Sequence, residues 1–400
     1  MGLNGVVTAE RVHIGFFGMR NAGKSSLVNA LTGQKISVVS EVKGTTTDPV
    51  KKAMELLPLG PVVILDTPGL DDEGELGKMR VERAREMLRK TDIAVLVVDA
   101  VLGIGDADRE LASELSARKI PYVVAYNKSD LLTARAELSD SEIYVSAESG
   151  EGIEELKQRL GKFAEGVKNK KPLVSDLLSA GDTVVLVTPI DESAPKGRII
   201  LPQQMVLRDI LDSHASAIVC QVEELSGIIA SQKLPPRMVI TDSQVFGRVS
   251  KILPRNIPLT SFSILMARYK GDLPTLVSGF AALKNLSDGD KVLISEGCTH
   301  HRQCNDIGGV KMPGWIRDFS GACPDFSFTS GGEFPADTSE YKLVVHCGGC
   351  MINEAEMAHR IGVAGRFNTP MVNYGIAIAG MHGILERSLE LFPDILGLLK

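Results

Sequence analysis

The sequence predicts an α/β protein with three domains, the last two of them smaller and each built on a mainly parallel sheet. Short apolar runs suited to buried strands alternate with helical patterns along almost the whole chain, which is the order typical of parallel sheets. One such run, residues 12–17, leads into GMRNAGKS at residues 18–25, a GxxxxGK[ST] phosphate loop between a strand and a helix. The length of 400 residues suffices for two or three separate cores.

Composition excludes several classes of protein. With 44% hydrophobic and 24% charged residues, the chain is an ordinary globular protein. The net charge of -6 argues against nucleic acid as the main partner. No apolar run approaches the roughly 20 residues of a membrane helix, and the N-terminus lacks a signal-peptide pattern. We therefore expect a cytoplasmic protein with no membrane contact.

The phosphate loop assigns roles to its own residues. Gly18 and Gly23 let the backbone wrap phosphate oxygens, Lys24 brings a positive charge to the β- and γ-phosphates, and the Ser25 hydroxyl ligates Mg²⁺. The remaining residues of the loop that we expect to bind nucleotide are Asn21, Ala22 and Ser26.

Two further segments fit a nucleotide that carries a γ-phosphate. The sequence DTPG at residues 66–69 follows an apolar strand, as expected of the acidic residue that holds Mg²⁺ through water and of the turn that senses the γ-phosphate. The segment GTTTD at residues 44–48 supplies a switch-loop threonine for Mg²⁺. The residues expected to take part in catalysis are Lys24, Thr46, Asp66 and Gly69.

The base is predicted to be guanine. The sequence NKSD at residues 127–130 follows the apolar run 122–126, and Asp130 can accept hydrogen bonds from N1 and N2 of guanine. Adenine lacks this pair of donors, and a site built around such a bond rejects the wrong ligand by roughly 10⁴- to 10⁵-fold. Asn127 and Lys128 belong to the same motif, and Ser146 with Ala147 completes the guanine side.

This region resembles the translation-factor-like GTPases, in the branch that contains TrmE and Era. The resemblance implies that Asn21 helps to bind a potassium ion in place of an arginine finger; the alternative is that Asn21 only stabilises the turn. Leu70 stands where Ras-like enzymes carry a water-orienting glutamine, and an apolar side chain cannot orient water by hydrogen bonding. We therefore expect slow basal hydrolysis that depends on a cation, a partner or dimerisation.

Helical spacing of apolar residues over 153–163 closes the first domain, residues 1–167, and a basic linker follows. The middle domain, residues 172–257, is expected to contain strands 183–187, 216–220 and 238–241 with helices 203–213 and 244–253. It shows no metal spacing and no catalytic group, so it is either an assembly or dimerisation domain or a spacer.

The third domain, residues 258–400, is expected to be helical over 261–269 and 272–286. Strands at 291–295 and 341–345 follow, separated by a Gly-rich segment. A helix over 351–360, a strand at 369–374 and a closing helix over 376–392 complete the domain. We expect Cys350 to lie where strand turns into helix, so that the helix dipole favours its thiolate.

Five of the six cysteines lie in this last domain, and three of them flank histidines after predicted strands. The sequence CTHH at residues 298–301 and HCGGC at residues 346–350 offer the thiols of Cys298, Cys347 and Cys350. They suit zinc bound as Cys₃His or a 4Fe-4S cluster held by three thiolates, and spacing alone does not decide. The candidates for a fourth ligand are His300, His346, Glu296, Asp306 and water. Cys304 and Cys323 are expected to be structural thiols, although Cys304 is near enough in sequence to substitute as a ligand.

The whole combination resembles the HydF family, the GTPase maturases of iron–iron hydrogenases. The resemblance implies a homodimer whose third domain carries a 4Fe-4S cluster and receives the two-iron precursor built by the radical-SAM maturases HydE and HydG. The precursor then passes to the hydrogenase apoprotein. An alternative is a zinc-bearing GTPase of tRNA modification or ribosome assembly, which the acidic charge and the lack of a basic RNA-binding module oppose. A third alternative is a GTP-gated redox protein, which would need a complete fourth ligand to the cluster rather than an open position.

Overall fold

The computed structural model describes residues 10–33, 51–66, 85–168, 171–189, 199–297 and 307–399. The chain divides into two compact units, unit 1 over residues 1–170 and unit 2 over residues 171–400. Among these described residues, no helix combines the length and the apolar character needed to cross a bilayer.

Within the described residues, unit 1 contains a six-stranded sheet in the order β2-β3-β1-β4-β5-β6. Only β2 and β3 are antiparallel. The strands are β1 (Val12–Phe17), β2 (Lys51–Leu56), β3 (Gly60–Asp66), β4 (Ile93–Asp99), β5 (Tyr122–Asn127) and β6 (Glu142–Tyr144). The central strands β1 and β4 are buried on both faces, which explains why their sequences are apolar almost without a break.

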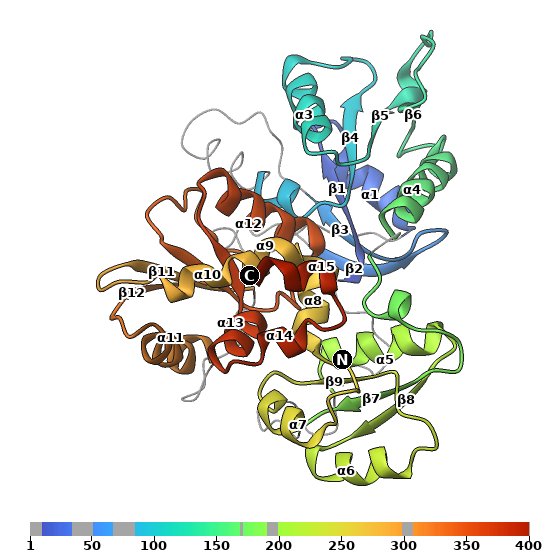
Figure 1. The fold of residues 1–400 in the computed structure, drawn as a ribbon. Helices are drawn as coiled ribbons and strands as arrows, with labels where there is room; N and C mark the ends of the chain where they lie inside the picture. The colour runs from blue at the N-terminus through green and yellow to red at the C-terminus, as the bar shows by residue number, and fades with distance from the viewer. Residues whose placement is uncertain are drawn as a thin grey trace, which may run out of the picture. The chain divides into compact units, whose positions relative to one another are not determined.

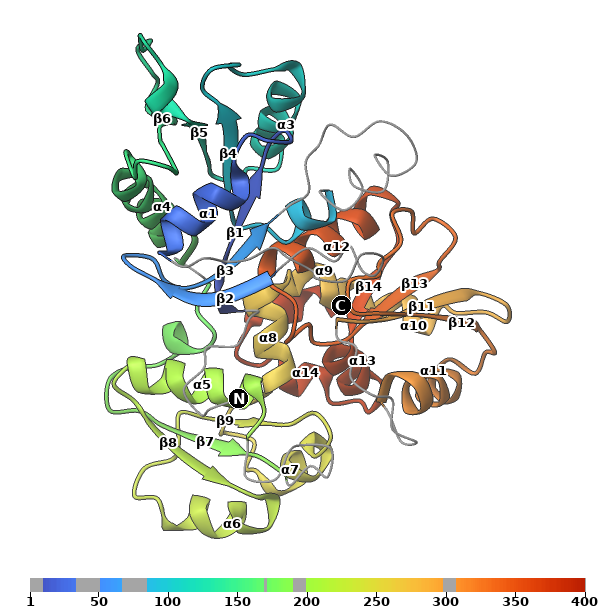
Figure 2. The ribbon, with the colours of Figure 1, turned by 180° about the vertical axis from the view of Figure 1, so that it is seen from behind.

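Helices cover both faces of this sheet. On one face, α1 (Lys24–Thr32) and α4 (Ile153–Lys168) pack through Leu27 and Leu156 against Ile14 of β1, and both helices lie on the same side in Figure 2. On the other face, α3 (Asp106–Ala117) packs through Leu111 against Phe17. Because these strands are parallel, the carboxyl ends of β1, β3 and β5 lie at one edge of a three-layer domain. A short 3₁₀ helix, η2 (Ser129–Leu131), follows β5.

The first sheet of unit 2 is parallel and has the order β10-β9-β7-β8. Its strands are β7 (Thr183–Val187), β8 (Ser216–Cys220), β9 (Met238–Thr241) and β10 (Leu259–Ser261). The helix α5 (Leu201–Asp212) lies on one face, while α6 (Val222–Ser231) and α7 (Phe246–Ile252) lie on the other, as Figure 1 shows. A 3₁₀ turn, η3 (Ser175–Leu177), precedes β7.

The second sheet of unit 2 is also parallel, in the order β12-β11-β13-β14. Its strands are β11 (Lys291–Glu296), β12 (Asp325–Ser330), β13 (Leu343–His346) and β14 (Met371–Asn373). The helices are α8 (Phe262–Lys270), α9 (Leu273–Ser278), α10 (Phe280–Lys284), α11 (Met312–Ser320), α12 (Glu354–Arg366), α13 (Tyr374–Met381), α14 (Leu385–Ser388) and α15 (Pro393–Leu396). A π-helical turn, η4 (Ile307–Lys311), precedes α11, and η5 (Gly397–Leu399) ends the described chain.

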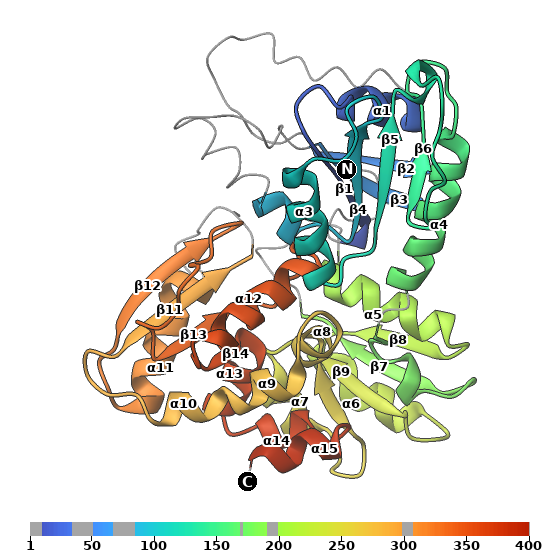
Figure 3. The same ribbon diagram turned by 90° about the horizontal axis from the view of Figure 1, so that it is seen from above.

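Figure 3 shows α12 on one face of the second sheet and α11 with α13 on the other. A single apolar core joins the two sheets of unit 2: Val184 of β7, Leu265 of α8 and Val345 of β13 belong to the same buried cluster. Unit 2 is therefore one compact body that contains two parallel sheets.

The predicted fold class is confirmed, because all three sheets are mainly parallel and helices cover them. Several expected elements differ from the observed ones. Residues 259–261 form β10, a strand that was not expected and that takes up the first residue of the helix expected over 261–269. α11 with β12 occupies the segment expected to be only Gly-rich. The helices expected over 272–286 and 376–392 are each divided in two. The helix expected from residue 351 begins at Glu354, so Cys350 precedes the helix and its Asn353 cap.

Candidate functional site

The phosphate loop of unit 1 has the backbone shape that its glycines require. Gly18 has φ 138°, and a Cβ there would lie 2.1 Å from the carbonyl oxygen of Val97 on β4. Asn21 also has positive φ, 62°, and its side chain is exposed. Ala22 is buried, and α1 starts at Lys24. The exposed Ser25 and Ser26 thus occupy the first turn of a helix whose N-terminal N–H groups favour anions.

Lys24 is buried beside the loop that it is expected to serve. Its Nζ donates to the carbonyl oxygens of Gly18 at 2.9 Å and Met19 at 2.8 Å. These bonds hold the ammonium across the mouth of the loop. A bound phosphate offers this cation a charged acceptor, which is a stronger partner than a neutral carbonyl.

The guanine motif is tied to the phosphate loop by Asn127. Its Nδ2 donates to the carbonyl of Ala22 at 2.9 Å, and its Oδ1 accepts from the backbone N–H of Ala147 at 3.0 Å. One buried amide therefore fixes three separately predicted segments together. Asp130 is exposed on η2, while Ser146 is buried and accepts from the N–H of Ser149.

Sequence reasoning missed the ion pair that holds Lys128. Its Nζ lies 2.5 Å from Oδ2 of Asp99, the last residue of β4. Partial burial raises the pKa of Asp99, but the hydrogen bonds from Lys128 and from the Val101 N–H outweigh this effect, so that the pKa is lowered. The one sequence signal that could have identified Asp99 as the partner of Lys128 is its position at the end of an apolar run, next to the strand that leads into the NKSD motif.

Other residues expected at the nucleotide lie outside the described structure. Thr46 and Gly69 are not among the described residues. Asp66 ends β3 in register with Phe16 of β1, which places its backbone at the same sheet edge as the phosphate loop.

In unit 2, the two strands that precede the cysteine motifs are neighbours. β11 and β13 are parallel, with Ser295 paired to His346. The sulfur of Cys347 accepts from the backbone N–H of Gly297 at 3.0 Å and from that of Gly349 at 3.4 Å. These donors favour the thiolate of Cys347. Cys298 and His300 lie outside the described residues, but Cys298 is the next residue after Gly297.

The turn that separates Cys347 from Cys350 depends on glycine. Gly349 has φ 64°, and a Cβ there would meet the terminal methyl of Met357 at 2.4 Å. Both cysteines are partly exposed. Within the described ranges, no three His, Cys, Asp or Glu side chains converge as a metal site would require. The first half of the proposed ligand set falls outside those ranges.

His346 is completely buried, and both of its ring nitrogens are engaged. Nε2 lies 3.0 Å from an amino group of Arg360, and Nδ1 lies 2.6 Å from the carbonyl oxygen of Cys347. Burial, with Arg360 nearby, lowers the pKa of His346 to about 3. To bind iron, this ring would have to give up one of these two partners.

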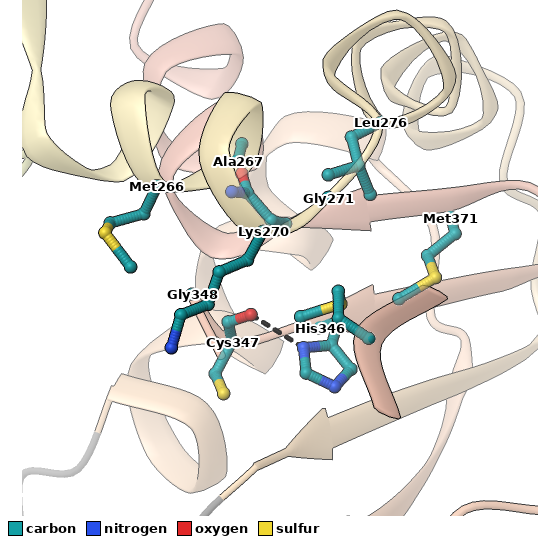
Figure 4. A pocket seen from close by; sticks show the side chains of 11 residues that line it. Met266, Ala267, Lys270, Gly271, Leu276, His346, Cys347, Gly348 and Met371 are labelled. Atoms are coloured by element: carbon teal, nitrogen blue, oxygen red, sulfur yellow. Dashed lines mark hydrogen bonds between the residues drawn. The ribbon is translucent and has the colours of Figure 1, made fainter. Parts of the chain in front are cut away.

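A second buried cation approaches the cysteine loop from α8. Lys270 is 3% exposed, and its Nζ donates to the carbonyls of Cys350 at 3.1 Å and Ile352 at 3.0 Å. Figure 4 shows this side chain descending toward the loop above the His346 ring. The cavity between them is about 10 Å³, room for one water-sized molecule. Neither Lys270 nor Arg360 stands in a motif, so sequence alone gave no signal for them.

The other two described cysteines lie elsewhere. Burial raises the pKa of Cys220 to about 11, which keeps it a thiol. Cys323 is exposed and precedes the amino end of β12, whereas Cys347 follows the carboxyl end of β13 in the same parallel sheet. The two thiols are therefore at opposite edges. Cys304 lies outside the described residues.

Three family models match consecutive parts of the chain. Residues 13–128 match a model described as a 50S ribosome-binding GTPase. Residues 173–271 match the hydrogen maturase F dimerization domain, and residues 274–391 match the hydrogen maturase F tetramerization domain. Unit 1 thus contains a GTPase domain. The two domains that follow it are those described by the dimerization and tetramerization models.

Curated relatives match over part of their length. GTPase Der of Kosmotoga olearia is 31% identical over 220 residues, which cover 50% of this chain and 49% of that protein. The tRNA modification GTPase MnmE of Dechloromonas aromatica is 34% identical over 165 residues, covering 40% and 36%. The chain therefore spans about half or less of these relatives. A solved structure titled as a probable GTP-binding protein engB is 28% identical, with coverage of 39% and 100% and a TM-score of 0.31.

Proposed function

Because the chain belongs to the hydrogen maturase F family, we propose that it is a GTP-hydrolysing scaffold that carries a 4Fe-4S cluster and delivers a two-iron precursor to iron–iron hydrogenase apoprotein. The observation that best supports this proposal is the environment of Cys347. Its sulfur receives two backbone N–H groups at the strand edge where Gly297 leads directly into Cys298.

The described residues fit an iron–sulfur group. Hydrogen bonds to sulfur stabilise thiolate ligands and tune such clusters. The cation Lys270 contacts the loop and would offset part of the negative charge that thiolates bring, whereas the charge of Arg360 is balanced by Glu356. Cys298, Cys347 and Cys350 would hold the group, which when bound supplies an iron with a position open to an exchangeable ligand. With His346 engaged on both sides, we propose that His300, a carboxylate or water is the fourth ligand.

The GTPase domain would bind and hydrolyse GTP with Mg²⁺. Lys24 would neutralise the β- and γ-phosphates, and the hydroxyls of Ser25 and Thr46 would ligate Mg²⁺. Asp66 would hold the ion through water, and the Gly69 N–H would contact the γ-phosphate. Asp130 would select guanine, with Lys128 steadied by Asp99.

The family descriptions of the two later domains support self-association, and we propose that both contribute to it. Radical-SAM maturases that build the precursor and the hydrogenase apoprotein would be the other partners. The division near residues 271–274 between the two family models is our proposed domain boundary, since β10 belongs to the first sheet of unit 2.

Metal analysis and visible absorption of anaerobically purified full-length protein test the scaffold proposal. We expect a brown protein with about four irons per chain, and acid-labile sulfide in equal amount. Colourless protein that contains one zinc per chain would instead support a zinc-bearing GTPase. In that case the loop of Cys347 would be structural.

The exposed Asn21 leads to a prediction about monovalent cations. If it helps to hold potassium beside the phosphates, GTP hydrolysis should rise at least about tenfold when sodium is replaced by potassium at constant ionic strength. Constant ionic strength removes screening as an explanation. Asn21→Ala should lose the stimulation while still binding GTP. Equal rates in the two salts would leave Asn21 with a turn-forming role only.

A further inference from the structure

Arg360 of α12 is the largest side chain that is fully buried in the described structure. Its Nε donates to Glu356 Oε1 at 2.9 Å, and another guanidinium nitrogen donates to the carbonyl of Gly331 at 2.6 Å. The guanidinium carbon lies 5.2 Å from the centre of the Phe334 ring. A buried charge is tolerated only when it is paired and hydrogen-bonded, and these contacts supply both conditions.

The same guanidinium fixes the protonation pattern of His346. Arginine can only donate, so the 3.0 Å contact makes Nε2 of His346 the acceptor. The ring proton of the neutral imidazole must then be on Nδ1, where it donates to the carbonyl oxygen of Cys347 at 2.6 Å. Arg360 therefore places the ring proton on Nδ1, the atom that donates to the Cys347 carbonyl.

The peptide on the other side of Cys347 is connected to Arg360 as well. The N–H of Cys347 donates to the carbonyl of Ser295 at 2.9 Å, and the Ser295 hydroxyl lies 3.4 Å from the guanidinium. Thr329 of β12 donates to that hydroxyl at 3.0 Å. Both backbone polar groups of Cys347 are thus anchored to residues that contact Arg360.

We propose that Arg360 is a positioning residue for the Cys347 thiolate, acting through His346 and Ser295, with Glu356 as its counter-charge. Positioning here means that Cys347 Sγ stays under the N–H groups of Gly297 and Gly349. His346 then supports the loop and does not bind the metal. The proposal rests on the proposed function only in taking Cys347 as a metal ligand.

Unit 2 contains a matched control for this arginine. Arg387 is 6% exposed, and one of its nitrogens donates to the carbonyls of Leu253 and Pro254, near the end of α7. Arg360 is 0% exposed, so both guanidinium groups are buried, but Arg387 contacts no residue of the cysteine loop through a described hydrogen bond. Arg387→Met therefore removes a buried guanidinium without touching the proposed positioning network.

The test is a Co²⁺ titration of metal-free full-length protein, read from thiolate-to-cobalt absorption. Glu356→Met/Arg360→Met removes both charges and leaves no unpaired ion, so it should fold. We expect it to bind Co²⁺ about 10- to 100-fold more weakly than wild type, as other losses of support around metal ligands do. Arg387→Met should stay within about twofold of wild type by the same measure. Unchanged Co²⁺ binding in the double variant, or an equal loss in Arg387→Met, would overturn the proposal.

A conservative variant and a spectrum complete the test. Arg360→Lys keeps the charge but cannot reproduce the planar fork, so its Co²⁺ affinity should fall between wild type and the double variant. In protein labelled with ¹⁵N-histidine and loaded with cluster, pulsed electron paramagnetic resonance should show no strongly coupled nitrogen from His346. A strong coupling that disappears in His346→Gln would refute the positioning role. If the protein binds Co²⁺ but never holds an iron–sulfur cluster, the scaffold function is rejected, while the positioning role of Arg360 is still tested by the Co²⁺ affinities.

Discussion

Replacing Cys347 by alanine is expected to abolish both iron retention and hydrogenase activation while leaving GTP hydrolysis unchanged. The Cys347 sulfur accepts two backbone hydrogen bonds at the edge shared by β11 and β13. Alanine would leave those two N–H groups without an acceptor and would remove one of the three thiolates proposed to hold the cluster. We expect iron content to fall at least about tenfold. Iron analysis, activation of hydrogenase apoprotein and GTP turnover should be measured on the same preparation.

Cys323→Ala is the matched control for this substitution. Cys323 is a free thiol of the same sheet, but it is exposed and precedes the amino end of β12. Its loss should change neither iron content nor activation. If Cys347→Ala still activated the hydrogenase, or if Cys323→Ala failed to activate it, the cluster would not be held where we propose.

Much of the fold could be predicted because its strands are buried on both faces. The runs that form β1, β4 and β7 are apolar almost throughout, as is typical of strands covered by helices on both sides. β12 escaped prediction because its sequence DFSFTS is partly exposed at a sheet edge, so its composition resembles that of a loop. β10 escaped because three residues carry no periodicity.

The residues of the candidate sites could likewise be predicted only in part. Residues within motifs, such as Asn127, could be named because spacing and strand ends bring them together. The cations around the cysteine loop could not be named, because Lys270 ends one helix and Arg360 stands inside another, where single charges normally face solvent. The start of α12 was also mispredicted: Asn353 caps the helix at Glu354, past Cys350, so the helix terminus expected at Cys350 lies further along the chain. The backbone N–H groups that contact a cysteine sulfur donate to Cys347 instead.

Replacing Asp130 by asparagine is expected to change the preferred nucleotide from GTP to xanthosine triphosphate. Asp130 is exposed on η2, which follows the strand whose last residue, Asn127, bonds to Ala22 of the phosphate loop. In Asp130→Asn, an amide that donates replaces the carboxylate that accepts from guanine N1 and N2. GTP should be disfavoured relative to xanthosine triphosphate by roughly 10⁴-fold compared with wild type. Competition binding with both nucleotides measures this ratio directly.

Asp140→Asn supplies the control, since Asp140 is another exposed carboxylate of unit 1 and its backbone carbonyl, not its side chain, accepts from Arg159. It removes the same charge and should leave the nucleotide preference unchanged. The Asp130→Asn protein should also retain its bound iron, because Asp130 and Cys347 belong to different compact units. A variant that still prefers GTP would mean that a different residue recognises the base, whereas loss of binding to both nucleotides would show that η2 had collapsed.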